Sequence, residues 1–350
     1  MLWLYIFSLA IKIAVTAKST GSARNSIPMN RLYTATTVRN SHTHRPVKLS
    51  IEPEPVRTEW RYDTVANWPG RLCREGAGKR QSPINIRTEL VKPDSGKEFI
   101  KYGPLRLHGY QSVLVSGVNN GRTIQFTMEG DEAMHPTLTG GPLQYLYRLE
   151  QLHFHWLSEH AVNGYKYPME IHFVHIRADL SPSEALRKRD GIAIIAVFGT
   201  IKSEIENDEN FIASEMMEEV VRQLPQLNRY GDQLSGIVLN MSKLLTANQQ
   251  SYVTYSGSLT SPECNEAVTW IILDNPVFMT YGQYKDFSYL AKTRYNYRDL
   301  QDSNITMYRP GSRLPKPMIF GVFANMYNYV ASFLKNMNRM MKSEPVNTQY

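Results

Sequence analysis

The sequence predicts a mainly β protein with one domain built around a sheet and few helices. Between residues 59 and 312, short apolar runs are broken by Gly and Pro, as in chains made of many short strands. Two longer apolar runs, Gly191–Phe198 and Val268–Leu273, are typical of strands buried on both faces. The 350 residues would allow two domains, but sheet proteins of about 250 residues often form one.

The other expected strands are short and bounded by turn residues. In chain order they lie at Leu105–Leu107, Val113–Val118, Thr123–Met128 and Leu143–Leu149. The stretch Phe211–Leu224 has instead an apolar residue at every fourth position from Ile212 onward, which predicts an amphipathic helix that ends at Pro225.

The first 17 residues form an apolar run, interrupted by Lys12, that ends in the small residues Val15, Thr16 and Ala17. This pattern favours a signal peptide that is cleaved during secretion. We therefore expect a secreted, extracellular protein, and an uncleaved membrane anchor is the alternative.

The basic character of the chain belongs to its two ends. The formal net charge is +7, but residues 18–58 carry seven Lys or Arg against two acids, and residues 313–350 carry five against one. Without these ends and Lys12, residues 59–312 hold 26 basic and 29 acidic side chains. A nucleic-acid groove would need a basic patch within the domain, so we expect no nucleic-acid partner. Residues 18–58, rich in Ser, Thr, Asn, Arg and Pro, are predicted to be a flexible linker.

The C-terminal extension, residues 313–350, has a different pattern. Apolar residues recur every three or four positions, and Lys335, Arg339 and Lys342 follow them. We expect an amphipathic helix that docks on its own domain, on a partner protein or on a membrane surface. A single membrane span is the alternative, although Asn325 interrupts the apolar stripe.

Two cysteines and two glycosylation sequons bear on the compartment of the protein. Cys73 and Cys264 are the only cysteines in the sequence. Such a pair suggests one disulfide in a secreted chain, and free thiols in a cytosolic one. The sequons begin at Asn240 and Asn304 and agree with secretion.

The residues that could carry chemistry concentrate in one stretch, Gln151–His175, which holds five of the nine histidines. Side chains on a strand alternate between its faces, so His153 and His155 leave the same face. Asn163 and Gly164 follow in a loop that is long enough to turn the chain back.

The returning strand, Glu170–Ile176, supplies a third histidine. Its alternation puts His172 and Val174 on the face of Glu170 and His175 on the other face, so parity selects His172. Three imidazoles with an open fourth position are typical of a catalytic zinc site, whereas a structural site has four ligands, usually with Cys. The other interpretation of these histidines is ordinary packing in the core.

Several motifs of this chain resemble those of the α-class carbonic anhydrases. They are QSPINI at 81–86, NNG at 119–121, GGPL at 140–143, QLHFHW at 151–156, SEH at 158–160, MEIHFVH at 169–175, GSLTSP at 257–262 and NYRDLQ at 296–301. The resemblance runs from about residue 60 to about residue 312. It implies a large central, mostly antiparallel, twisted sheet, and zinc-dependent reversible hydration of CO2 to bicarbonate and a proton.

The resemblance also implies roles for individual residues. His153, His155 and His172 would bind zinc, in agreement with strand parity. Thr260 would hydrogen-bond to zinc-bound hydroxide and donate its own hydroxyl hydrogen to Glu159, which orients the nucleophile. Residues that would orient the histidines or order water are Gln151, Glu170, Asn296, Tyr62, Asn120 and Gln125.

CO2 is nonpolar and needs an apolar wall beside the nucleophile. The resemblance implies a substrate site made of Val174, Ile194, Leu259, Thr260, Ser261, Val268 and Trp270. Ordinary core packing is the alternative interpretation of its apolar members.

Two further positions matter for the comparison with this family. Fast members carry a proton-shuttling His directly after the NNG turn, where this chain has Arg122, which stays protonated and cannot shuttle. We therefore expect an active enzyme that is limited by proton transfer. Cys73 and Cys264 match the positions at which extracellular members form a disulfide.

Two other functions compete with the enzyme. A binding module could keep the fold without catalysis, but such relatives typically lack a ligand histidine, and here all three are present with Thr260 and Glu159. A matrix protein could use the basic ends, although acidic or repetitive inserts are absent from the sequence. A catalytically weak binding or matrix protein is thus the alternative to an active enzyme.

Overall fold

The computed structural model describes residues 60–93, 102–202, 215–245, 251–290, 296–302 and 304–310. The predicted signal peptide, basic linker and C-terminal extension lie outside these residues, so their predictions stay open. No helix among the described residues is long and apolar enough to cross a membrane.

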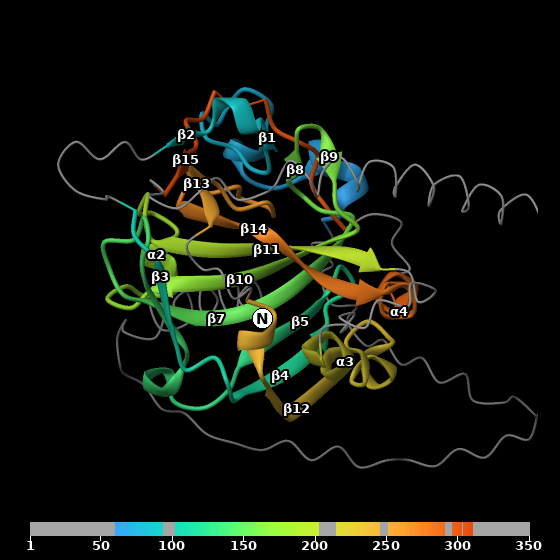
Figure 1. Cartoon of the computed structure of the whole chain (residues 1–350). Helices are drawn as coiled ribbons and strands as arrows, with labels where there is room; N and C mark the ends of the chain where they lie inside the picture. Colours follow the sequence, from blue (N-terminus) through green and yellow to red (C-terminus); the bar gives the residue numbers. More distant parts are fainter. Residues whose placement is uncertain are drawn as a thin grey trace, which may run out of the picture.

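One sheet of twelve strands dominates the molecule (Figure 1). Its main path runs β12-β4-β5-β7-β10-β11-β14-β13-β15-β2, with β6 paired to β7 and β3 paired to β6. All pairs are antiparallel except β11 with β14 and β15 with β2. The prediction of a mainly β fold around a mostly antiparallel sheet is confirmed.

The strands of this sheet are β2 (Lys92–Pro93), β3 (Leu105–His108), β4 (Val113–Asn119), β5 (Ile124–Met128), β6 (Thr137–Gly140), β7 (Tyr147–Trp156), β10 (Met169–Arg177), β11 (Ile192–Lys202), β12 (Gln233–Leu239), β13 (Tyr252–Gly257), β14 (Val268–Thr280) and β15 (Tyr308–Arg309). A small second sheet holds β1 (Asn85–Ile86), β8 (Ala161–Val162) and β9 (Tyr165–Lys166).

One predicted strand, Leu143–Leu149, is wrong in its first half. Strand β7 begins only at Tyr147, and β6 occupies Thr137–Gly140 instead. Gly140 and Gly141 both have positive φ, 78° and 53°, so the chain turns between the two strands. The two glycines are a turn signal in the sequence, and the apolar residues that follow them belong to the turn region rather than to the strand.

Helices are few and short. The α-helices are α2 (Pro182–Ala185), α3 (Glu215–Val221) and α4 (Tyr281–Leu290), and the 3-10 helices are η1 (Tyr62–Asn67), η2 (Arg71–Cys73), η3 (Thr88–Leu90), η4 (Glu132–Met134), η5 (Leu224–Leu227) and η6 (Met241–Lys243). The predicted helix 211–224 is observed as α3, which ends at Val221, and residues 211–214 lie outside the described part. Pro225 falls inside η5 rather than at the end of α3.

Each face of the sheet carries its own core. On one face Leu152, Phe154 and Phe173 pack with Met216 of α3 and Phe287 of α4, all fully buried. The other face carries Val174, Ile194 and Trp270, among other buried residues. Since α3 and α4 contribute only to the first core, the second face is available to form a site.

Candidate metal centre

Three histidine nitrogens converge on the face of the sheet opposite α3 and α4. Strands β7 and β10 are antiparallel neighbours, and their register places His172 directly opposite His153. His153 Nε2 lies 3.1 Å from His155 Nε2 and 3.3 Å from His172 Nδ1. Zinc–nitrogen bonds of about 2.0–2.1 Å in a tetrahedron separate two nitrogens by roughly 3.3 Å, so the donor set fits zinc. The expectation that parity brings these three residues together agrees with the geometry.

The second nitrogen of each ring faces a hydrogen-bond acceptor. The Nδ1–H group of His153 donates to Gln151 Oε1 at 2.8 Å, and the Nε2–H group of His172 donates to Glu170 Oε1 at 2.7 Å. His155 donates through Nδ1 to the backbone oxygen of Asn296. These acceptors fix each ring so that the lone pair of the other nitrogen points to the centre, as metal-binding histidines require.

The side chain of Asn296 forms two hydrogen bonds to strand β7, the strand that carries His155. Its Oδ1 accepts from the Trp156 backbone N–H at 2.9 Å, and its Nδ2 donates to the Phe154 oxygen at 2.8 Å. Both partners flank His155 on β7. The Asn296 side chain therefore fixes its own backbone oxygen against that ring, across about 140 residues of chain.

Burial and nearby histidines favour the neutral form of His153 and His155. Burial, followed by the neighbouring His155 and His172, holds the pKa of His153 well below its usual value. Burial also lowers the pKa of His155, although Glu159 acts in the opposite direction. Neutral imidazole is the form that binds a metal, so the site is prepared for one.

His160 belongs to the site, although the sequence did not identify it. Its backbone N–H and its Nδ1 contact the two oxygens of Glu170 at 2.8 and 2.7 Å, and its Nε2 lies 2.6 Å from the hydroxyl of Tyr255. Burial by itself would raise the pKa of Glu170, but His160 and His172 hold it well below its usual range. His160 lies between strands β7 and β8, where no alternation can assign a direction to a side chain.

The hydrogen bond expected between Thr260 and Glu159 is not observed among the described residues. Glu159 is fully buried, and its Oε1 accepts from the Arg298 backbone N–H at 2.8 Å. Its Oε2 has no hydrogen-bond partner among the described residues and lies 3.5 Å from His155 Nε2. Thr260 lines the adjacent cavity. This carboxylate oxygen is buried, lacks a hydrogen-bond partner within the described part of the chain and lies beside the three converging nitrogens. A hydrogen-bond donor or a cation bound at this centre would satisfy it.

A cavity of about 250 Å³ opens above His153 and His172. Its apolar side includes Val174, Ile194 and Leu259, with Leu186 and Ile192, which the sequence did not identify. Thr260 and Ser261 also line the cavity.

Two residues expected on this wall, Val268 and Trp270, lie behind it. Neither is among the described residues that line the cavity, and both are fully buried. The Trp270 indole N–H donates to the Ser258 oxygen at 3.0 Å, and its ring packs 4.9 Å from that of His172. Trp270 therefore supports a ligand ring from the core rather than contacting the cavity.

The opposite side of the cavity is polar. Tyr62, Asn120 and Gln125 line it, with Asn120 Nδ2 donating to Gln125 Oε1 at 3.4 Å. Arg122 also lines it, and the centre of its guanidinium lies 4.4 Å from the centre of the Trp60 ring. The residue that directly follows the NNG turn is thus a cation that lies over an indole ring.

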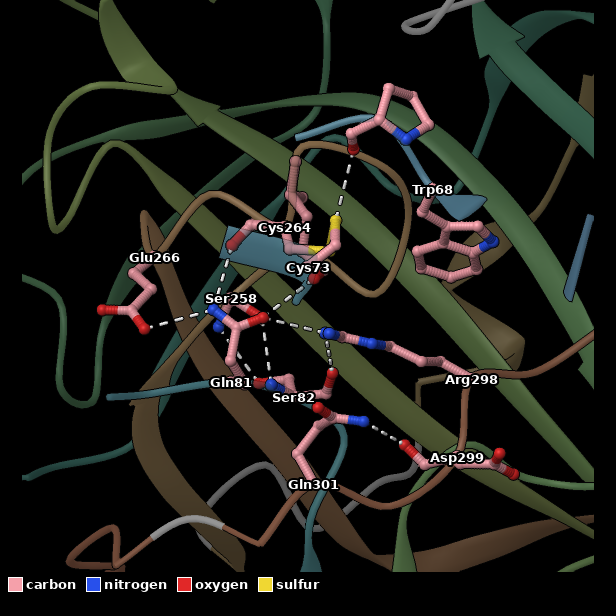
Figure 2. Close-up of a disulfide and its surroundings, with 12 residues drawn as sticks. Trp68, Cys73, Gln81, Ser82, Ser258, Cys264, Glu266, Arg298, Asp299 and Gln301 are labelled. Atoms are coloured by element: carbon pink, nitrogen blue, oxygen red, sulfur yellow. Dashed lines mark hydrogen bonds between the residues drawn. A yellow bond between two sulfur atoms is a disulfide. The ribbon is translucent and has the colours of Figure 1, made fainter. Parts of the chain in front are cut away.

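A disulfide between Cys73 and Cys264 joins the N-terminal segment to the loop that carries Thr260 (Figure 2). Beside it, Gln81 Nε2 donates to the Cys264 oxygen at 3.1 Å, and the Arg298 guanidinium donates to Gln81 Oε1 at 3.0 Å (Figure 2). The segment that carries Tyr62 and the loop that carries Thr260 are therefore covalently linked.

The two sequons differ in exposure. Asn304 is exposed, as is Thr306 two residues later. Asn240 is half-buried, it accepts from the Ser242 hydroxyl at 2.6 Å, and the intervening Met241 is fully buried.

Comparison with known proteins places this arrangement in a family. The family model for eukaryotic-type carbonic anhydrases matches residues 63–320. The chain is 32% identical to putative carbonic anhydrase 3 of Caenorhabditis elegans, over 71% of this chain and 92% of that protein. It is 33% identical to human carbonic anhydrase 7 and 32% identical to the mouse protein, each over 67% of this chain and 86% of the relative. The chain therefore belongs to the eukaryotic-type carbonic anhydrase family.

Proposed function

We propose that this protein is an active, zinc-dependent carbonate dehydratase that interconverts CO2 and bicarbonate. The observation that carries the proposal is the set of three ring nitrogens, each pointed at one centre by an acceptor on its other nitrogen. Family membership supports CO2 hydration in general, and the complete ligand set supports catalysis in this member.

When bound, Zn2+ would supply a Lewis acid that activates water at neutral pH. His153, His155 and His172 would hold it, and the residues around them do the remaining work. Val174, Ile194 and Leu259 offer a nonpolar molecule an apolar surface in the cavity. Glu159, anchored by the Arg298 backbone, presents its second oxygen to the site, where it can accept the hydroxyl hydrogen of Thr260.

We further propose that turnover is limited by proton transfer. A guanidinium does not release its proton in the working pH range, so Arg122 cannot relay protons from the cavity to solvent. A dissolved buffer must then remove the proton, and the rate should rise with buffer concentration.

The test is stopped-flow CO2 hydration by the purified full-length protein, loaded with zinc or treated with a chelator, across a range of buffer concentrations. We expect activity that depends on both zinc and buffer. A zinc-loaded protein without activity at high buffer would favour the catalytically weak binding or matrix protein instead. Activity that does not depend on buffer would leave catalysis intact but contradict the proton-transfer limit.

We also propose that the protein is secreted. The Cys73–Cys264 disulfide supports this, because such bonds persist in oxidising compartments and are rare in the cytosol. Expression in secreting eukaryotic cells tests it: the mature protein should appear in the medium without residues 1–17. Full retention inside the cells with the first residues intact would contradict it.

A further inference from the structure

The charge at the cavity mouth bears on which proton carriers the protein accepts. The described residues that line the cavity include one basic side chain, Arg122, and one carboxylate, Glu263. Glu263 is exposed, where solvent and salt screen its charge, while Arg122 is half-buried against Trp60. Arg122 therefore dominates the field that a molecule meets on entering.

The position of Arg122 is fixed by its surroundings. Trp60 is 8% exposed, and its ring packs edge-on against Tyr62 and Trp68, each with centroids 5.1 Å apart. The Cys73–Cys264 disulfide belongs to the same buried cluster. A guanidinium over such a ring keeps its positive charge, and that charge attracts an anion in the cavity.

The charge of Arg122 also reaches the polar wall. Burial raises the pKa of Tyr62 well above its usual value and Glu159 adds to this, while Arg122 acts in the opposite direction. An anion between Arg122 and the predicted metal centre would lie in this field. A cation there would be repelled, and would be repelled further by a bound metal ion.

We propose that Arg122 makes the cavity select anionic oxyanion carriers, such as hydrogen phosphate, over neutral imidazole bases as the partners that remove the proton. This inference rests on the proposed function and deepens it, because it assigns Arg122 a positive role instead of only the loss of a shuttle. The proton moves from the site to the dianion, which leaves as the monoanion. Imidazole would leave as a cation past the guanidinium, which is unfavourable.

The kinetic test measures CO2 hydration by the zinc-loaded full-length protein in phosphate and in imidazole buffers at constant ionic strength. The quantity compared is the concentration of each buffer that gives half of the maximal rate. We expect Arg122→Gln to raise this concentration for phosphate roughly three- to fivefold, the size of one exposed charge interaction, and to lower that for imidazole, because its cationic product then no longer passes a guanidinium. Arg122→Lys keeps the charge and should keep the preference. The matched control is Arg61→Gln, which removes an exposed arginine paired with Asp63 outside the cavity. Equal changes for both buffers, or no change for phosphate, would overturn the inference.

A second readout does not depend on activity. Phosphate titrated into the zinc-loaded protein should change the tryptophan fluorescence, because Arg122 lies on Trp60, and Arg122→Gln should remove that change while Arg61→Gln keeps it. If CO2 hydration is absent in both buffers, the proposed function fails and this titration alone decides the role of Arg122. A fluorescence change that is identical in the wild type and in Arg122→Gln would reject it.

Discussion

Glu170 Oε1 lies 2.7 Å from Nε2 of the predicted zinc ligand His172, and both side chains are fully buried. The same carboxylate accepts two more hydrogen bonds, from the backbone and the ring of His160. A residue two positions before a ligand on one strand thus connects that ligand to a loop.

Replacing Glu170 with Gln should weaken zinc binding. An amide has one acceptor oxygen, so it cannot satisfy the three N–H donors that face the carboxylate, and its NH2 group would meet one of them. We expect roughly a 10- to 100-fold loss of zinc affinity, measured by competition with a chromophoric chelator. Glu89→Gln, at an exposed position, is the control and should bind zinc like the wild type. Wild-type affinity in the Glu170 variant would show that the carboxylate does not orient the ligand.

How far the sequence predicts this site depends on the kind of residue. Strand alternation alone selected His172 over His175, and the structure agrees: Val174 joins His172 at the cavity, while His175 faces the other core. The roles of Glu159, Thr260 and Asn296 rest only on family motifs, because no local rule links residues about 100 to 140 positions apart in the chain. His160 and Tyr255 were missed for the same reason.

The fold shows a similar division. The long apolar runs became the central strands β11 and β14, since a strand buried on both faces needs no alternation. Helix α4 was not predicted, because Tyr281–Leu290 mixes aromatic, charged and small residues without a clear apolar stripe. Its Phe287 is nevertheless fully buried against Phe154, which is a tertiary contact that local spacing does not reveal.

Removing the disulfide should destabilise the domain. The bond closes a loop with a sequence separation of 191, so its loss would lower the free energy of unfolding by about 2–5 kcal/mol. The measurement is urea unfolding of the wild type with and without reductant. The Cys73→Ser/Cys264→Ser protein should match the reduced wild type and ignore reductant, because the sequence has no other cysteine. Equal stability of the oxidised and reduced wild type would contradict this.

His175 should make stability fall as the solution becomes acidic. Burial lowers its pKa from the usual value of about 6.5 to about 4, while its Nδ1–H donates to the Ala193 oxygen and its Nε2 accepts from the Tyr110 hydroxyl. Because the folded pKa is depressed, the unfolded chain binds the extra proton first. The stabilisation is complete above about pH 6.5 and is lost as pH falls towards 4, by about 1.4 kcal/mol per pH unit at most.

Urea unfolding of the metal-free protein at a series of pH values measures this effect. The difference between the wild type and His175→Asn, which cannot titrate, should change by about 2 kcal/mol between pH 6.5 and pH 5. His153 and His155 titrate in both proteins and cancel in the difference. His108→Asn, at an exposed position, should follow the wild-type curve. Parallel curves for the wild type and the His175 variant would show that His175 does not carry the dependence.

Replacing Arg122 with His should restore a proton relay. The side chain would remain at the cavity mouth beside Trp60, and an imidazole titrates near neutral pH, so it can accept a proton from the site and release it to solvent. We expect turnover in weakly buffered solution to rise by roughly 10-fold or more, the lower part of the range for a positioned acid or base. The gain should shrink as buffer is added, because buffer then carries the proton in both proteins.

Arg122→Gln separates this effect from the loss of the charge, since it removes the guanidinium without adding a relay. A gain in the Gln variant equal to that in the His variant would show that Arg122 obstructs the cavity, and no gain in the His variant would show that proton transfer is not limiting.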